Sequence, residues 1–178
     1  MEPHVRLART NDLTPRELQA IRGLLDVAYD GDFTDADWDH ALGGTHAIVL
    51  DAGSVVSHGS VVQRQLIYEG RALKAGYVEA LATRADRRRR GYGSCVMAEL
   101  ERIIRSTYDL GALGAADEAA RMYVSRGWQV WDGPLHALTP SGVVATAEEQ
   151  GCVYTFPAEL SLDRSKPLCC DWRAGDVW

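Results

Sequence analysis

The sequence lacks the features of membrane proteins and secreted proteins. It has no run of about 18 consecutive apolar residues, which is roughly what a membrane-spanning helix needs. Its first residues contain no apolar stretch of the kind that a signal peptide carries. We therefore expect a cytoplasmic protein that does not bind to a membrane.

An excess of positive charge is also missing. The formal net charge is −6 at pH 7. Proteins that bind nucleic acids are usually basic overall, so this balance argues against a nucleic-acid partner. Acidic clefts concentrate cations, so the composition suits a cationic small molecule as ligand.

The cysteines and histidines show no spacing typical of a metal site. The four cysteines lack a C-x-x-C pair, and in a cytoplasmic chain we expect them to be reduced and to serve in packing. Cys95 has no histidine near it in the sequence and is a poor candidate nucleophile. No metal is predicted, and we expect structural roles for His40, His46, His58 and His136.

The first half of the chain predicts one strand, two helices and a three-stranded meander. Residues 5–9 alternate between apolar and polar side chains, as a strand does. Thr14 with Glu17 and Thr34 with Asp37 form capping boxes, which predict helices over about 15–29 and from 35 to near Gly43. Strands are predicted at about 46–51, 55–65 and 72–83.

The second half alternates helices and strands. Helical periodicity follows Gly93, a short strand is predicted at 110–114, and a second helix runs from a cap at Asp117 to Gly127. Late strands are predicted at 128–131 and 152–156, whereas the tail 160–178 shows no clear period. The order predicts an α/β chain with a mixed sheet, in one domain over 1–178.

A run of arginines and glycines lies between the meander and the next helix. The motif Arg88-x-x-Gly91-x-Gly93 opens a predicted helix, whose first backbone N–H groups can bind an anion. Its glycines let phosphate oxygens approach the backbone closely, and its arginines neutralise the phosphate charge. Together these features favour a diphosphate site. A solvated basic turn or a nucleic-acid patch is the alternative. The G-x-G-x-x-G and P-loop patterns are both missing, so the ligand is not obviously NAD or ATP.

This motif resembles the pyrophosphate motif of the GNAT acyltransferases, whose order of strands and helices is also similar. The resemblance implies the GNAT fold, a mixed and mostly antiparallel sheet flanked by helices, with acetyl-CoA bound where two central strands splay. It also implies which residues bind the cofactor: Leu81, Ala82, Thr83, Arg88, Arg89, Arg90, Gly91, Tyr92 and Gly93.

A narrower resemblance, to the aminoglycoside 2'-N-acetyltransferases, runs nearly end to end. The matching segments are 31–34 with Trp38 and His40, 42–46, 76–80, 108–113, 122–128 and 170–178. The string over 170–178 is much more specific than the phosphate motif. The resemblance implies acetylation of antibiotics, hence resistance, and a homodimer.

Acetyl transfer to an amine needs a base for the nucleophile and an acid for the leaving thiolate. Glu79, late in the central strand, is the candidate base, and a structural carboxylate on the sheet rim is the alternative. Tyr123 is the candidate acid by resemblance; from the sequence alone, a helical tyrosine is more often a packing residue. Oxyanion stabilisation is expected from a strand N–H.

Carboxylates cluster around 30–39, at 148–149 and in the tail, as a polyamine sugar would require. Asp35 and Asp37 also suit a helix start, so a purely structural role stays open for both. Trp178 is expected to cover a sugar ring, and Gly114 stands where relatives tend to carry serine. The expected substrate residues are Asp32, Asp37, Glu79, Ala80, Gly114, Glu148, Glu149, Asp176 and Trp178.

The sequence therefore predicts an acetyl-CoA-dependent enzyme that acetylates the 2'-amine of aminoglycosides in a ternary complex. Two alternatives remain open. One is the same chemistry on another small polyamine or amino sugar. The other is a CoA-binding regulatory module without catalysis.

Overall fold

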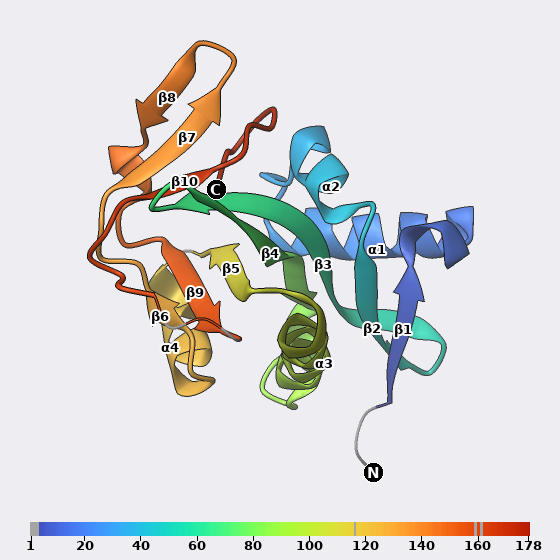
Figure 1. Cartoon of the computed structure of the whole chain (residues 1–178). Coiled ribbons are helices and arrows are strands. Elements are labelled where there is room, and N and C mark those ends of the chain that lie inside the picture. The colour runs from blue at the N-terminus through green and yellow to red at the C-terminus, as the bar shows by residue number, and fades with distance from the viewer. Residues whose placement is uncertain (1–3, 116, 159, 161) are drawn as a thin grey trace. The chain divides into compact units, whose positions relative to one another are not determined.

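The computed structural model describes residues 4–115, 117–158, 160 and 162–178 (Figure 1). The chain divides into two compact units, the first made of the residues up to Val62 together with Val78–Arg102. The second consists of Gln63–Tyr77 and Ile103–Trp178. Strands β3 (Ser54–Tyr68) and β4 (Arg71–Thr83) and helix α3 (Tyr92–Thr107) contribute residues to both units. A single domain over 1–178 stays a prediction.

Both predicted capping boxes open helices of the first unit. Thr14 caps α1 (Pro15–Ala28), where its Oγ1 accepts the N–H of Glu17 while Glu17 accepts the N–H of Thr14. Thr34 and Asp37 make the same exchange at the start of α2 (Asp35–Ala41). These reciprocal bonds satisfy N–H groups that have no partner within a helix.

Three strands of the first unit form an antiparallel sheet between helices. Strand β1 (Val5–Arg9) pairs with β2 (Thr45–Asp51), and β2 pairs with β3. Helix α1 buries Leu24 and Leu25 in a cluster that includes Ile48 of β2. Helix α3 packs closely on β3 at Gly59, where an added Cβ would lie 2.9 Å from a methyl group of Val96.

Two histidines lie in the interior of this unit. His46 on β2 and His58 on β3 are both fully buried, and His46 Nδ1 lies 2.9 Å from His58 Nε2. Burial lowers the pKa of His46 to about 4. Burial, with the charge of a protonated His46 as a smaller cause, lowers the pKa of His58 to about 3. Both imidazoles are therefore neutral at pH 7.

The second unit holds the later strands and helix α4 (Asp117–Ser125). The strands of the second unit that follow α3 are β5 (Leu110–Gly114), β6 (Gln129–Val130), β7 (Leu135–Thr139), β8 (Gly142–Ala145), β9 (Val153–Pro157) and β10 (Leu168–Cys170). Parallel pairing of β4 with β5 covers Ala75–Tyr77, and β5 pairs antiparallel with β9. Strand β10 runs antiparallel to β3 and parallel to β7. A mixed, mostly antiparallel sheet is thus confirmed.

Three strands were absent from the sequence-based prediction. The hairpin β7–β8 has a four-residue second strand whose residues are all exposed, so no alternation marks it. Strand β10 has only three residues, too few to show a period, and it forms because distant β3 and β7 lie on either side of it.

The sequence predicted Asp117 as the cap of the second helix. In the structure Asp117 is instead the first helical residue of α4, and the cap position, 116, lies outside the described residues.

The predicted packing role of two cysteines is confirmed, because Cys169 and Cys170 are buried thiols. None of the four cysteines forms a disulfide. In the part of the chain that the structure describes, no helix is long and apolar enough to cross a membrane. Within the same residues, no group of three or more side chains has a metal-binding arrangement.

We predict that the free energy of unfolding falls as the pH drops from about 6.5 toward 4. Over this range the unfolded imidazoles take up protons, whereas buried His46 and His58 do not. Each imidazole contributes a slope of up to about 1.4 kcal/mol per pH unit. Urea unfolding at several pH values measures the slope. Replacement of His58 by glutamine should reduce it, and an unchanged slope in that variant would contradict the assignment.

Candidate functional site

The predicted arginine-glycine turn joins β4 to α3. A short 3-10 helix at Ala85–Arg87 leads into it, and the backbone reverses through positive φ at Arg89 (61°) and Gly91 (82°). Helix α3 then begins at Tyr92, and the N–H of Cys95 donates to Gly91 O at 2.9 Å. The earlier N–H groups have no intrahelical acceptor, so this helix start offers donors to an anion.

The arginines of this segment divide into two groups. Arg87 is tied down by Asp51 and Asp86, and Arg84 pairs with Asp86. The three that follow, 88–90, are exposed. Hence their positive charge faces solvent beside the helix start, as the diphosphate hypothesis requires. The donor set of this turn, backbone N–H groups plus exposed guanidinium groups, fits a diphosphate.

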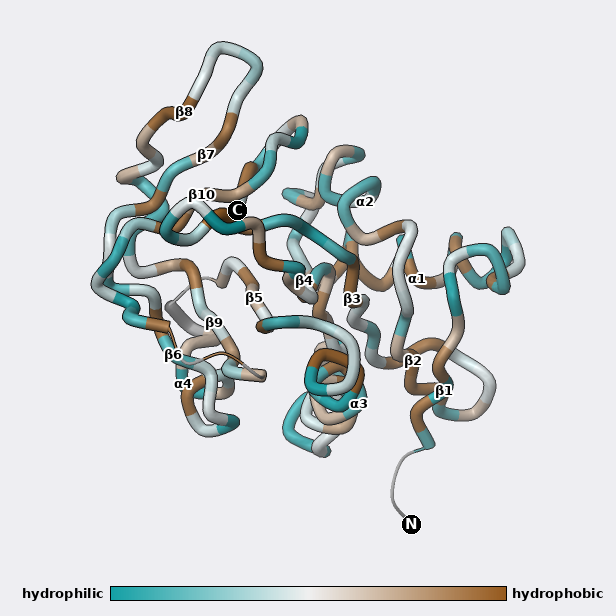
Figure 2. Tube along the Cα trace, viewed as in Figure 1, coloured by the Kyte–Doolittle hydropathy of each residue, from teal (hydrophilic) through white to brown (hydrophobic). Residues whose placement is uncertain are grey.

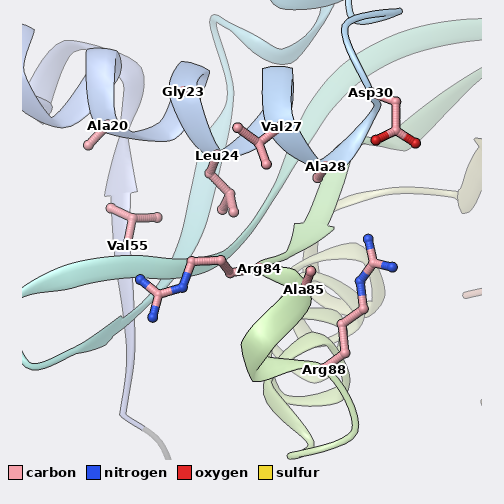
Figure 3. Close-up of a pocket in the computed structure, with 10 residues that line it drawn as sticks. All are labelled: Ala20, Gly23, Leu24, Val27, Ala28, Asp30, Val55, Arg84, Ala85 and Arg88. Atoms are coloured by element: carbon pink, nitrogen blue, oxygen red, sulfur yellow. The ribbon is translucent and has the colours of Figure 1, made fainter.

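A hollow of about 430 Å³ lies between α1 and the residues before this turn (Figure 3). Its wall combines apolar side chains of α1, such as Leu24 and Val27, with the charged groups of Arg84 and Arg88. Arg88 therefore belongs both to the predicted phosphate motif and to the wall of a cavity. The wall thus offers apolar surface beside two guanidinium groups and one carboxylate, that of Asp30.

Strand β4 has an irregular backbone immediately after Glu79. Ala80 adopts φ 52°, a left-handed conformation that costs a residue with a Cβ about 1–3 kcal/mol. Three consecutive carbonyls accept side-chain hydrogen bonds: Ala80 O from His58 Nδ1 (2.9 Å), Leu81 O from Tyr29 Oη (3.1 Å) and Ala82 O from Ser57 Oγ (3.0 Å). Two side chains of β3, together with that of Tyr29 just after α1, therefore fix the predicted catalytic and cofactor segment.

Two of the predicted acidic residues lie near Tyr29 in the first unit. Burial raises the pKa of Tyr29 to about 12, and the negative charges of Glu79 and Asp37 contribute to this rise. Glu79 and Asp37 are half-buried, and Asp32 is exposed. Asp37 also completes the cap of α2, so the structural role that the sequence left open is present, and its role in substrate binding stays a prediction.

Tyr123, the candidate acid, belongs to the second unit. It is buried on α4, where its ring lies 6.1 Å from Trp128 and 6.0 Å from Tyr154, centroid to centroid. The packing role that a helical tyrosine suggests is therefore present in the structure. It does not conflict with a hydroxyl that serves as a proton donor.

The sequence-based prediction missed the residue that organises the C-terminal segment. Arg64 on β3 is 5% exposed, and its guanidinium donates to Asp171 Oδ1 at 2.8 Å and to the carbonyls of Asp171 and Val177. It also stacks over the Tyr77 ring at 4.6 Å. The available signal was the alternation of the strand, which places Arg64 on the same face as the apolar residues Val62 and Leu66, where a buried arginine needs partners.

A second arginine holds the last residues. Arg173 lies over the Tyr77 ring at 5.2 Å, and it donates to the backbone oxygens of Asp176 and Trp178 at 2.8 Å each. Oxygens of the final segment are thereby fixed near β5: a Cβ added at Gly114 would lie 3.4 Å from Trp178 O. A serine at position 114 would therefore fit with ordinary contacts and would bring its hydroxyl toward Trp178.

The expectation that Trp178 covers a sugar ring is wrong. Its side chain is buried, 3% exposed, and the indole N–H donates to Thr146 Oγ1 at 2.9 Å. The sequence could not distinguish a terminal tryptophan on the surface from one that folds back. Burial gives the indole a packing role and leaves the backbone oxygen of this residue as its polar group near Gly114.

The remaining carboxylates separate into binding candidates and structural residues. Glu149 has a raised pKa, caused by burial and by the nearby charges of Asp176 and Glu148, so these three lie together in the second unit. Asp35, by contrast, pairs with Arg22, and Asp171 pairs with Arg64. Asp163 caps its own loop through Ser165.

Residues 9–131 match the family described as "Acetyltransferase (GNAT) domain". The chain is 45% identical over 177 residues to the aminoglycoside 2'-N-acetyltransferase of Mycolicibacterium fortuitum, a match that covers 97% of this chain and 91% of that protein.

Similar solved structures support the fold. The Escherichia coli GNAT family N-acetyltransferase YhbS, solved with CoA, has a TM-score of 0.62 at 16% identity over 94% of this chain and 89% of its own. A probable N-acyltransferase of Enterococcus faecalis has a TM-score of 0.59 at 15% identity over 72% of this chain. The match spans 33% of that longer protein.

We predict that Arg64→Met lowers the free energy of unfolding by roughly 1–3 kcal/mol, because it leaves the carbonyls of Asp171 and Val177 without their donor. Thermal melting and urea unfolding measure the loss. Arg102→Met is the matched control, since Arg102 makes an exposed pair with Glu99 and should change stability little. Equal melting temperatures for the two variants would contradict this role of Arg64.

Proposed function

Because the chain belongs to the GNAT acetyltransferase family, we propose that it is an acetyl-CoA-dependent aminoglycoside 2'-N-acetyltransferase that acts in the cytoplasm and confers antibiotic resistance. The observation that carries the proposal is the 45% identity to such an enzyme along 97% of the chain. An alignment over 97% of the chain includes the phosphate motif and at least part of the C-terminal segment. We propose one domain and no nucleic-acid partner.

The turn between β4 and α3 binds the pyrophosphate of the cofactor. Exposed Arg88, Arg89 and Arg90 and the positive-φ Gly91 support this role, as do the N–H groups at the start of α3. The backbone of Leu81, Ala82 and Thr83 pairs with the pantetheine arm. When bound, acetyl-CoA supplies the thioester from which the acetyl group is transferred.

Glu79 acts as the base. A half-buried carboxylate can accept the amine proton at Oε1 or Oε2, directly or through a water, so that the amine becomes nucleophilic. Tyr123 can donate the proton of its Oη to a departing sulfur, since a phenol hydroxyl is a hydrogen-bond donor. The amine would attack directly in a ternary complex, without a covalent acyl-enzyme, before the sulfur departs and takes up its proton.

Carboxylates bind the several ammonium groups of the substrate. Asp32, Asp37 and Glu79 belong to the first unit, and Glu148, Glu149 and Asp176 to the second. Charge-assisted hydrogen bonds to ammonium groups are roughly twice as strong as neutral ones. We also assign substrate contacts to the backbone of Ala80 in the first unit, and to the backbone of Gly114 and the oxygen of Trp178 in the second. The carboxylates favour a polycation over a neutral amine.

We propose a homodimer that pairs through β8. This strand is last in the order of the sheet path, and Val143 and Val144 on it are 61% and 43% exposed. Figure 2 shows hydrophobic residues along this hairpin. Exposed apolar edge strands associate readily, so an edge of this kind suits pairing with a second copy.

We predict turnover of aminoglycosides with a 2'-amine and none of those with a 2'-hydroxyl. Kanamycin B, tobramycin and gentamicin should release thiol from acetyl-CoA, whereas kanamycin A and amikacin should not. A thiol-release assay with all five compounds tests this. Turnover of simple polyamines alone would instead support a different amine substrate. Cofactor binding without any thiol release would indicate a non-catalytic module.

We predict that Glu79→Gln lowers kcat by about 10²- to 10⁴-fold with little change in the substrate KM, because it removes the base and keeps the shape. The kcat of the wild-type enzyme should rise with pH, and the variant should lose this dependence. Glu99→Gln, on an exposed face of α3, serves as the control. An unchanged pH profile in Glu79→Gln would exclude Glu79 as the base.

A further inference from the structure

A continuous chain of hydrogen bonds links the loop before β2 to the strand that carries Glu79. It begins at the N–H of Gly43 and passes through Thr10, His46 and His58 to the carbonyl of Ala80. The four separations are Gly43 N to Thr10 Oγ1, 2.8 Å; Thr10 Oγ1 to His46 Nε2, 2.8 Å; His46 Nδ1 to His58 Nε2, 2.9 Å; and His58 Nδ1 to Ala80 O, 2.9 Å. Both imidazoles are fully buried.

The direction of this chain follows from its last acceptor. A carbonyl oxygen only accepts, so His58 Nδ1 must carry the proton that bonds Ala80 O. Neutral His58 then accepts at Nε2, which requires a proton on Nδ1 of His46. His46 in turn accepts at Nε2 from the hydroxyl of Thr10. Both histidines are therefore fixed as Nδ1–H tautomers.

The receiving peptide is the irregular one in β4. Ala80 has φ 52°, and such a conformation persists only where its surroundings fix it. The Ala80–Leu81 peptide is planar and trans, so its C=O and N–H point in opposite directions. A donor on Ala80 O therefore fixes where the Leu81 N–H points. It also strengthens that N–H as a donor, because hydrogen bonds in a chain polarise one another.

We propose that His58, oriented by His46 and Thr10, is a positioning residue for acetyl transfer. Its bond to Ala80 O holds the β4 backbone, so that Glu79, on one side of Ala80, keeps the direction in which it accepts the amine proton. The N–H of Leu81, on the other side, keeps its direction toward the cofactor. This inference rests on the proposed function for its catalytic consequence. The tautomers themselves follow from the buried chain alone and can be measured without any substrate.

Nuclear magnetic resonance tests the chain in the wild-type protein. A long-range ¹⁵N–¹H spectrum of ¹⁵N-labelled protein at neutral pH should show Nδ1 protonated and Nε2 unprotonated for both His46 and His58. This is the opposite of the tautomer that free histidine favours. Resonances assigned by His46→Gln and His58→Gln identify each ring. An Nε2–H tautomer or an imidazolium at His58 would overturn the proposal.

Two substitutions at one position separate positioning from packing. His58→Asn keeps an amide N–H at the place of Nδ1, so it can still donate to Ala80 O, but it cannot reach His46. His58→Gln keeps a polar group at the place of Nε2 and loses the donor to Ala80. We expect His58→Gln to lower kcat by about 10²-fold with KM nearly unchanged. His58→Asn should stay much closer to wild-type kcat.

Far-UV circular dichroism and thermal melting show whether each variant folds. The control is His136→Asn on β7, which replaces a histidine that is not part of the hydrogen-bond chain. Equal kcat values for folded His58→Gln and His58→Asn would overturn the positioning role. If the wild-type protein releases no thiol with any amine, the proposed function fails. In that case the measured tautomers of His46 and His58 still show whether the hydrogen-bond chain exists.

Discussion

The turn from β4 into α3 is the constraint on which the functional site depends. It requires left-handed backbone at Arg89 and Gly91, after which a helix start directs its N–H groups outward. Aspartates pair with Arg84 and Arg87, whereas the next three arginines are exposed and form no ion pair with a carboxylate of the described residues. A neutral ligand would gain little from this arrangement, whereas a diphosphate matches both the dipole and the charge.

The strand before this turn is equally constrained, but by side chains. His58, Tyr29 and Ser57 each donate to one carbonyl of the segment that follows Glu79. The left-handed backbone of Ala80 costs conformational free energy. The side-chain hydrogen bonds to this segment offset that cost and hold the irregular backbone in place. The backbone next to the proposed base is therefore held by side-chain hydrogen bonds at three successive carbonyls.

Local signals in the sequence were sufficient for the elements that frame the site. The capping boxes at Thr14 and Thr34 depend on residues three apart, and the helix after the arginine-glycine turn depends on nearby periodicity, so both could be predicted. Strand β10 and the contacts of Arg64 depend on residues about a hundred positions away. No local pattern encodes such partners, and the burial of Trp178 was missed for the same reason.

The structure of the protein crystallised with coenzyme A is the most direct test of this view of the site. We expect diphosphate oxygens within hydrogen-bonding distance of backbone N–H groups of residues 88–93, with at least one exposed guanidinium alongside. A nucleotide bound elsewhere, with the arginine-glycine turn facing only solvent, would contradict it.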